Sequence, residues 1–193
     1  GDELLTAGFL RTRIVLGDDW TLSAGARVDG WKTGSIDPAV ADRTETFFSP
    51  RVSLAWQRDG LGAHVAASRS YRTPTLNELH RGFRVGQIVT NPNPLLDPET
   101  LTGVEGGVLA SWTKVTARVT AFFNDLDGAI SNITLASTPT QITRERRNSD
   151  KIRANGVEFE ADARLTPTLS VNGQLVFTSS HFRGSVATPA IEG

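Results

Sequence analysis

Apolar and polar residues alternate with a period of two along most of the 193-residue chain. From Trp20 to Val28 every second residue is apolar or Ala, and Arg27 lies among the polar residues between them. Because successive side chains of a strand point to opposite faces, the pattern predicts a strand with one apolar and one polar face. The same reading applies to seven other segments, at about residues 4–16, 51–57, 61–68, 104–108, 115–124, 157–164 and 169–178. No helical period extends beyond two turns, so we predict an all-β chain with eight strands of about ten residues.

The predicted connections alternate in length. Short turns are expected at residues 17–19, 58–60, near Ser111 and at 165–167. Long loops are expected at about 32–46, 73–99 and 128–149, and another is expected to begin at His181. An antiparallel meander with tight turns at one end and long loops at the other is typical of an outer-membrane β-barrel.

Strand length and charge placement favour a membrane barrel over a soluble protein. Soluble strands peak near five or six residues, whereas a tilted membrane strand needs roughly 9–11. A water-filled lumen also accepts full charges inside strands. The charges that we expect to face the lumen are Arg27, Glu105, Arg118, Glu158 and Glu160.

The tryptophans are placed as an aromatic girdle would require. Trp20, Trp56 and Trp112 each lie beside a short turn, which would bring them to one membrane interface. Phe47, Phe48, Tyr71 and Phe123 lie near the opposite strand ends and could form the second girdle. Period-two alternation also suits a soluble β-sandwich or a β-solenoid, and these remain alternatives.

Composition narrows the function classes. No run approaches the ~18 apolar residues that a transmembrane helix needs. The chain has no Cys, which excludes disulfides, zinc–thiolate sites and a thiol nucleophile. A formal net charge of −1 gives no indication of nucleic-acid binding. The chain also has no Met, even at position 1, and we expect it to be a piece of something longer.

Residues that could support catalysis or metal binding are scattered. His64, His80 and His181 do not have the spacing of metal ligands. A catalytic set of Ser68, His64 and Asp29 would need hydrogen-bond reach that nothing in the sequence indicates. We therefore expect no enzyme activity, no cofactor and no metal site.

The expected loop at 73–99 is the best candidate for ligand binding. Long ordered loops on a rigid scaffold often carry binding residues, and guanidinium groups suit carboxylate or catecholate oxygens. The candidates are His80, Arg81, Phe83, Arg84 and Gln87. Alternatively, these cations contact lipopolysaccharide phosphates or solvent. The same two possibilities, ligand binding or contact with lipopolysaccharide or solvent, apply to Arg144, Arg146 and Arg147. On the strand at 157–164, Glu158, Glu160 and Asp162 share a face, and we expect Arg118 or Arg153 to offset their repulsion.

Several segments resemble, in order, the barrel of TonB-dependent outer-membrane receptors. Residues 67–79 read ASRSYRTPTLNEL and are similar to a segment typical of these barrels. Residues 91–100, NPNPLLDPET, and then Glu105-Gly106-Gly107 follow as in the family, although Val104 replaces a common aromatic. Further similar strands are GARVD at 25–29, SPRVSL at 49–54, AFFND at 121–125 with Ile130, and NGVEFEA at 155–161.

The resemblance implies a bacterial outer-membrane transporter with about 22 strands around a plugged lumen. Residues 1–193 would then be interior strands of that barrel, with the plug and terminal strands outside this chain. The implied function is TonB-dependent active uptake of a scarce nutrient, such as a ferric siderophore or cobalamin. The implied partners are outer-membrane lipid and lipopolysaccharide, the plug domain, the TonB complex acting through the plug, and a small-molecule ligand such as a metal chelate. A closed eight-stranded barrel and a ligand-free structural or adhesion barrel remain as alternatives.

Overall fold

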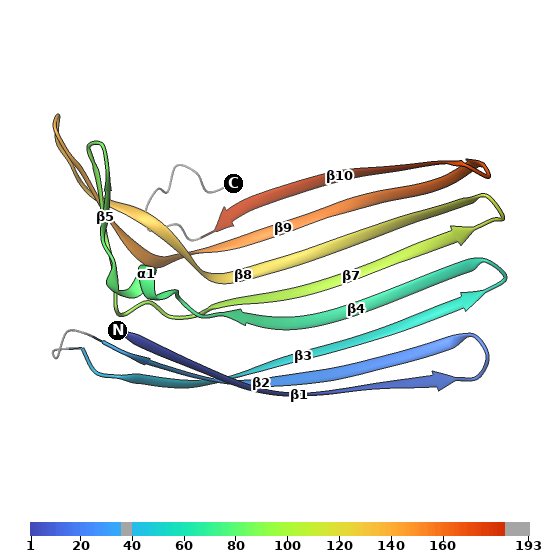
Figure 1. Cartoon of the computed structure of the whole chain (residues 1–193), viewed down its shortest axis with the longest axis horizontal. Coiled ribbons are helices and arrows are strands. Elements are labelled where there is room, and N and C mark those ends of the chain that lie inside the picture. The colour runs from blue at the N-terminus through green and yellow to red at the C-terminus, as the bar shows by residue number, and fades with distance from the viewer. Residues whose placement is uncertain (36–39, 184–193) are drawn as a thin grey trace.

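The computed structural model describes residues 1–35 and 40–183, except for the side chains of residues 149 and 150. It is one ten-stranded sheet with one short helix (Figure 1). The eight long strands are β1 (Asp2–Leu16), β2 (Trp20–Gly34), β3 (Arg43–Arg58), β4 (Leu61–Arg72), β7 (Glu99–Ser111), β8 (Val115–Ser137), β9 (Ile142–Thr166) and β10 (Leu169–Arg183). Helix α1 (Leu76–His80) and the short strands β5 (Phe83–Val85) and β6 (Ile88–Asn91) lie between β4 and β7.

The long strands form the predicted antiparallel meander, each pairing with the next along the chain. Strands β1 and β10 lie at opposite edges of the described sheet and do not pair with each other, so this sheet is not the closed eight-stranded barrel kept as an alternative (Figure 1). No described helix is both long and apolar enough to cross a membrane.

The long strands are longer than predicted. They run from 12 residues in β4 to 25 in β9, not about ten. The predicted loop at 128–149 was wrong, because β8 and β9 continue as a paired hairpin to a tight turn at residues 138–141. Register shifts near Leu126, Ala129 and Ile130, with Gly128 at φ +69°, break the alternation there. A bulge moves the side-chain pattern by one residue, which ends the period-two signal without ending the strand.

The short turns are where the alternation predicted them, at residues 17–19, 59–60, 112–114 and 167–168. Two of them use the left-handed backbone region, with Gly17 at φ +64° and Gly60 at φ +80°. At the other end, residues 36–39 of the predicted loop 32–46 lie outside the described residues. Strand β10 continues through His181 to Arg183, past the expected loop start, and residues 184–193 are not described.

The sheet has an apolar face and a polar face. Cross-strand partners on the apolar face include Trp20 with Trp56 and Val28 with Phe48. Large apolar side chains on this face remain exposed, for example Val108 at 58%. A wide band of exposed apolar side chains on one face of a long-stranded sheet suits contact with lipid.

The buried core lies on the polar face, at the end of the sheet that carries α1. Trp31, Phe47, Leu79 and Leu96 form this core cluster, with Tyr71 and Ile130 packed against it. Phe47 is only 8% exposed and Tyr71 packs against the core cluster, so the expected place of these two residues in a second aromatic girdle was wrong. Phe48, its neighbour in sequence, points the other way and is 56% exposed.

Candidate functional site

Residues 73–98, which we call the loop block, pack against the polar face through Leu79 and Leu96, while the β5–β6 hairpin within them rises beyond the end of the sheet (Figure 1). Helix α1 begins with a capping box: the Glu78 backbone N–H donates to Thr75 Oγ1 at 3.2 Å, and the Thr75 N–H donates to Glu78 Oε2 at 2.8 Å. The reciprocal bonds satisfy two backbone donors at the helix start. They also orient α1 so that Leu79 enters the core cluster, where it is 1% exposed.

Arg72, at the end of β4, ties the loop block to the sheet. Its guanidinium contacts Glu78 Oε2 at 3.0 Å and also donates to Glu99. The nearly buried Glu99 in turn accepts the backbone N–H of Ile130 at 2.7 Å. Burial alone would raise the pKa of Glu78, but hydrogen bonds from Arg72 and Thr75 outweigh it and hold that pKa below its ordinary value. Arg72 therefore joins β4, α1, β7 and β8.

Arg43, at the start of β3, holds the other end of the loop block. It donates to the carbonyl of Leu96 at 2.7 Å and to Asp97 Oδ1 at 2.8 Å, while its guanidinium lies 5.5 Å from the Trp31 ring centroid. Asn148 completes this end through two bonds to the Asp97 backbone, at 2.8 and 2.7 Å. The block is thus fixed to the sheet at both ends.

The β5–β6 hairpin is joined to the upper part of β9. Strand β6 pairs in parallel with β9, beginning with Ile88 opposite Ile142, and the two hairpins rise together at one end of the sheet (Figure 1). Arg146 on β9 donates to the carbonyls of Asn77 at 2.6 Å and Arg81 at 3.3 Å. Its guanidinium also lies 5.1 Å from the ring centroid of Phe83. These contacts unite the loop block and the β8–β9 hairpin into one surface.

Four of the five predicted ligand-binding residues lie exposed on or beside the β5–β6 hairpin: Arg81, Phe83, Arg84 and Gln87. His80 is set apart from them. It is half-buried against Gly1, its Nε2 has no hydrogen-bond partner, and burial lowers the pKa of its imidazole. His80 is therefore poorly placed to meet a ligand together with the other four.

The exposed hairpin surface carries an excess of unpaired positive charge. Each carboxylate in its vicinity already has a partner: Glu78 pairs with Arg72, Asp97 with Arg43, and Glu145 with Arg147 at 2.5 Å. Among the described residues, the cations with no ion-pair partner here are Arg81, Arg84, Arg144 and Arg146. Guanidinium groups without carboxylate partners, close to an exposed aromatic ring, suit an anionic ligand.

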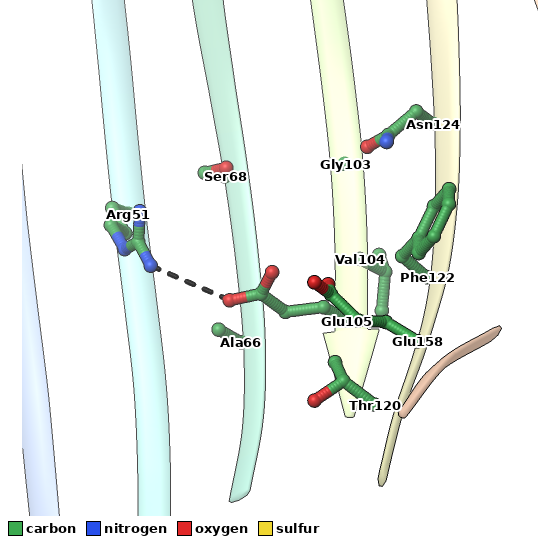
Figure 2. Close-up of a pocket in the computed structure, with 10 residues that line it drawn as sticks. All are labelled: Arg51, Ala66, Ser68, Gly103, Val104, Glu105, Thr120, Phe122, Asn124 and Glu158. Atoms are coloured by element: carbon green, nitrogen blue, oxygen red, sulfur yellow. Dashed lines mark ion pairs between the residues drawn. The ribbon is translucent and has the colours of Figure 1, made fainter. Parts of the chain in front are cut away.

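The register places the five expected lumen charges on the polar face: Arg27, Glu105, Arg118, Glu158 and Glu160. Across the middle of this face, Arg51 on β3 and Glu105 on β7 reach toward one another over β4 and approach to 3.5 Å (Figure 2). Small residues such as Ala66, Ser68 and Gly103 leave a hollow of about 230 Å³ there.

The predicted ion pairs that would offset the repulsion among the carboxylates of β9 form only in part. Arg118 pairs with Glu160 at 2.7 Å, as predicted, and Glu158 accepts a hydrogen bond from Gln174. Arg153 does not take part. It pairs with Asp125 at 2.9 Å on the opposite face, because the register places Arg153 opposite Asp125.

The aromatic residues beside the turns have the arrangement that a girdle needs. Trp20 and Trp56 are direct cross-strand partners on the apolar face. Trp112 follows β7 at the next turn and is 63% exposed. Their contact with the membrane interface stays a prediction.

The positions of Ser68, His64 and Asp29 do not support the catalytic set that the sequence analysis considered. Ser68 and His64 lie four residues apart on β4, which is about 13 Å along a strand and beyond hydrogen-bond reach. Asp29 is held by Arg27 at 2.6 Å. Within the described part of the chain, no three His, Asp or Glu side chains are placed to share a metal ion.

Residues 3–192 match the family model described as "TonB dependent receptor-like, beta-barrel". The chain belongs to this family. The predicted family, the all-β fold and the bacterial outer-membrane location are thereby confirmed. No curated protein sequence matches the chain.

Several solved TonB-dependent receptors have a similar fold. The FrpB iron transporter from Neisseria meningitidis (F3-3 variant) is 20% identical with a TM-score of 0.70, over 93% of this chain and 26% of its own. The copper transporter OprC is 16% identical with a TM-score of 0.76, over 98% of this chain and 32% of its own. The Serratia marcescens receptor HasR, solved with its hemophore HasA and heme, is 17% identical with a TM-score of 0.72, over 94% and 34%. The chain therefore spans about a third or less of these receptors.

The residues that fix the loop block were not predicted from the sequence. Trp31 was the one available signal, because it is a large aromatic on the polar side of the β2 alternation. Arg43, Arg72 and Arg146 gave no such signal, since their partners lie elsewhere in the sequence; Arg146, for example, is 69 residues from Asn77.

Proposed function

We propose that the chain is an interior part of the barrel of a TonB-dependent transporter that takes up a scarce nutrient, such as a ferric siderophore or cobalamin. The polar face lines the lumen, the apolar face meets lipid, and the loop block stands at the extracellular mouth. The long-loop end of such barrels is extracellular and the short-turn end periplasmic. Lipopolysaccharide would then surround the loop end of the apolar face.

The observation that carries the proposal is the cationic hairpin surface on an anchored support. Arg81, Arg84 and Arg146 lack carboxylate partners, and Phe83 offers an exposed ring beside them. A ligand that brings carboxylate or catecholate oxygens would gain charge-assisted hydrogen bonds there. Because the block is anchored by Arg43 and Arg72, little ordering would be needed on binding.

Transport itself depends on parts of the receptor beyond these strands. Unpaired backbone groups at a sheet edge are costly in lipid, so we expect β1 and β10 to pair with further strands of the same barrel. The plug domain would close the lumen, and the TonB complex would act through the plug. FrpB, OprC and HasR are described as handling iron, copper and heme, and this favours a metal complex as the cargo here.

A double substitution tests this ligand site. With Arg81→Gln and Arg84→Gln together, we expect binding of an anionic chelate to weaken about 100-fold or more, because hydrogen bonds to charged groups contribute roughly 1.5–3 kcal/mol each. The complete receptor would be assayed for binding and uptake of catecholate, hydroxamate and carboxylate chelates labelled with ⁵⁵Fe, and also of heme, copper and cobalamin. Uptake would be compared between iron-replete and iron-starved cells.

The matched control is Arg58→Gln, which removes an exposed guanidinium at the opposite end of the sheet, beside the β3–β4 turn, and should leave binding within about twofold. Uptake of no candidate under either condition would contradict transport and favour a ligand-free structural barrel. Unchanged uptake in the double variant would instead remove the hairpin from the ligand site.

A further inference from the structure

A groove of about 370 Å³ lies on the apolar face, near the short-turn end of the sheet. It crosses β3, β4, β7 and β8, and each of these strands is paired on both sides, so no further strand of the barrel would cover it (Figure 1). The loop block lies at the opposite end of the sheet, so the groove is separate from the cationic hairpin surface. Its lining includes Trp56, Leu61, Ala63, Val108, Ala110 and Ala117.

The register explains why this part of the apolar face is hollow. Ala63 lies between Trp56 on β3 and Val108 on β7 in one row, and Ala110 and Ala117 are direct partners in the next row. The three alanines form a floor, and larger apolar side chains stand beside it. A hydrocarbon chain that lies on this floor would gain dispersion contacts with the groove walls, which a flat face does not offer.

A guanidinium and two carboxylates stand at the turn end of the groove, which we call its mouth. Arg58 is the register partner of Leu61, and its Nη1 lies 3.6 Å from Asp19 while its Nε lies 3.5 Å from Asp59. Its Nη2 takes part in neither ion pair, so Arg58 retains N–H donors for an anion. The Asp59 side chain is 90% exposed, which leaves its carboxylate open to a further cation.

The charges at the mouth favour a zwitterionic head group. One guanidinium with two carboxylates gives an excess of negative charge, so the two carboxylates would repel a head group that is negative overall. A head group with a phosphate and a primary ammonium can place the phosphate on Arg58 and the ammonium on Asp59, with charge-assisted hydrogen bonds to both. A trimethylated ammonium has no N–H and cannot donate to Asp59.

We propose that this groove binds one phospholipid of the periplasmic leaflet, with the head-group chemistry of phosphatidylethanolamine. One acyl chain would lie on the alanine floor, the phosphate would meet Arg58, and the ammonium would meet Asp59. This binding differs from general contact with lipid because the tail and both charges of the head group have defined partners. The inference rests on the proposed function, since it takes the apolar face to meet lipid and the short turns to be periplasmic.

Native mass spectrometry of the complete receptor tests the lipid selectivity. The detergent-solubilised receptor would be titrated with phosphatidylethanolamine, phosphatidylcholine or phosphatidylglycerol, all with the same acyl chains. We expect phosphatidylethanolamine to bind about three- to fivefold more tightly than either of the others, which is the effect of one exposed charge pair. Equal affinity for the three lipids, or tighter binding of either competitor, would overturn the proposal.

A substitution at Asp59 tests the head-group contact. Asp59→Asn should lower the affinity for phosphatidylethanolamine to that for phosphatidylcholine, because the neutral amide no longer pairs with the ammonium. Asn tolerates the left-handed backbone of this position, at φ +49°, so the turn should be retained. Asp18→Asn, on the exposed β1–β2 turn, is the matched control and should leave the affinity unchanged. An unchanged affinity for phosphatidylethanolamine in Asp59→Asn would contradict the assigned head-group contact.

A substitution in the floor tests the tail contact. Ala63→Leu should weaken binding of all three lipids by a similar factor, whereas Ala67→Leu, on the same face of β4 but outside the groove, should not. Heat-modifiable gel mobility checks that both variants are folded. Equal binding by the two variants would show that the tail lies elsewhere and would overturn the groove as the site. Chelate uptake is measured separately on the unmodified receptor, so lipid selectivity without uptake would contradict transport and leave the lipid site intact.

Discussion

Val52→Arg should strongly destabilise the folded receptor in a lipid bilayer, whereas Ser53→Arg should be tolerated. Val52 is 46% exposed on the apolar face of β3, about midway between Trp56 and Phe48. An Arg on the lipid face near the bilayer midplane costs about 2–4 kcal/mol, because the charge has no water or counter-ion there. Ser53 lies on the opposite, polar face of the same strand, where a further guanidinium stays hydrated.

The measurement is urea unfolding of the complete receptor refolded into lipid vesicles, with heat-modifiable gel mobility as the check of folding. The two variants differ by one position along the strand and introduce the same side chain. Equal unfolding free energies, or a larger loss in Ser53→Arg, would mean that the two faces are assigned the wrong way round.

Leu96→Ala should detach the loop block, while Leu95→Ala should have little effect. Leu96 is 0% exposed in the core cluster beside Trp31, and its neighbour Leu95 is 70% exposed. Removing a fully buried leucine side chain typically costs 2–5 kcal/mol, through lost burial and the cavity that remains. That loss falls on a block of a few tens of residues, so the block should open locally before the barrel unfolds.

Hydrogen exchange of the backbone amides in α1 and β6 measures this opening. Protection should fall by roughly 30-fold or more in Leu96→Ala, since each 1.4 kcal/mol corresponds to a factor of ten. The strands β2 and β3 should keep their protection in both variants. Equal protection of α1 in the two variants would contradict the idea that the block is held by its core.

The strands were predictable because apolar residues recur at every second position along most of them and so share one face. The alternation from Trp20 to Val28 predicted both the strand and its two faces, and in the structure Trp20 lies directly opposite Trp56 on the apolar face. The same signal failed at Gly128, where a bulge shifts the side chains by one residue and the upper halves of β8 and β9 were interpreted as a loop.

The loop block was less predictable because its stability comes from contacts between residues far apart in the sequence. Arg72 meets Glu99 across 27 residues, and Arg43 meets Asp97 across 54. The alternation of apolar and polar residues relates only residues that are close in sequence, and composition carries no positions at all, so neither could indicate these pairs. They did identify a cation-rich loop with Phe83, but not that His80 turns away from it.

The central claim is that alternate residues of each long strand face lipid. This chain has no Cys, so in a complete receptor that is free of other cysteines, single cysteines can carry nitroxide labels at Ala63, Val65 and Ala67 and, in turn, at His64, Ala66 and Ser68. Electron paramagnetic resonance of the complete receptor in vesicles then measures collision with oxygen, which is concentrated in lipid. The account predicts high oxygen accessibility at 63, 65 and 67 and low values at 64, 66 and 68. High oxygen accessibility at 64, 66 and 68 with low values at 63, 65 and 67, or equal values at all six positions, would contradict it.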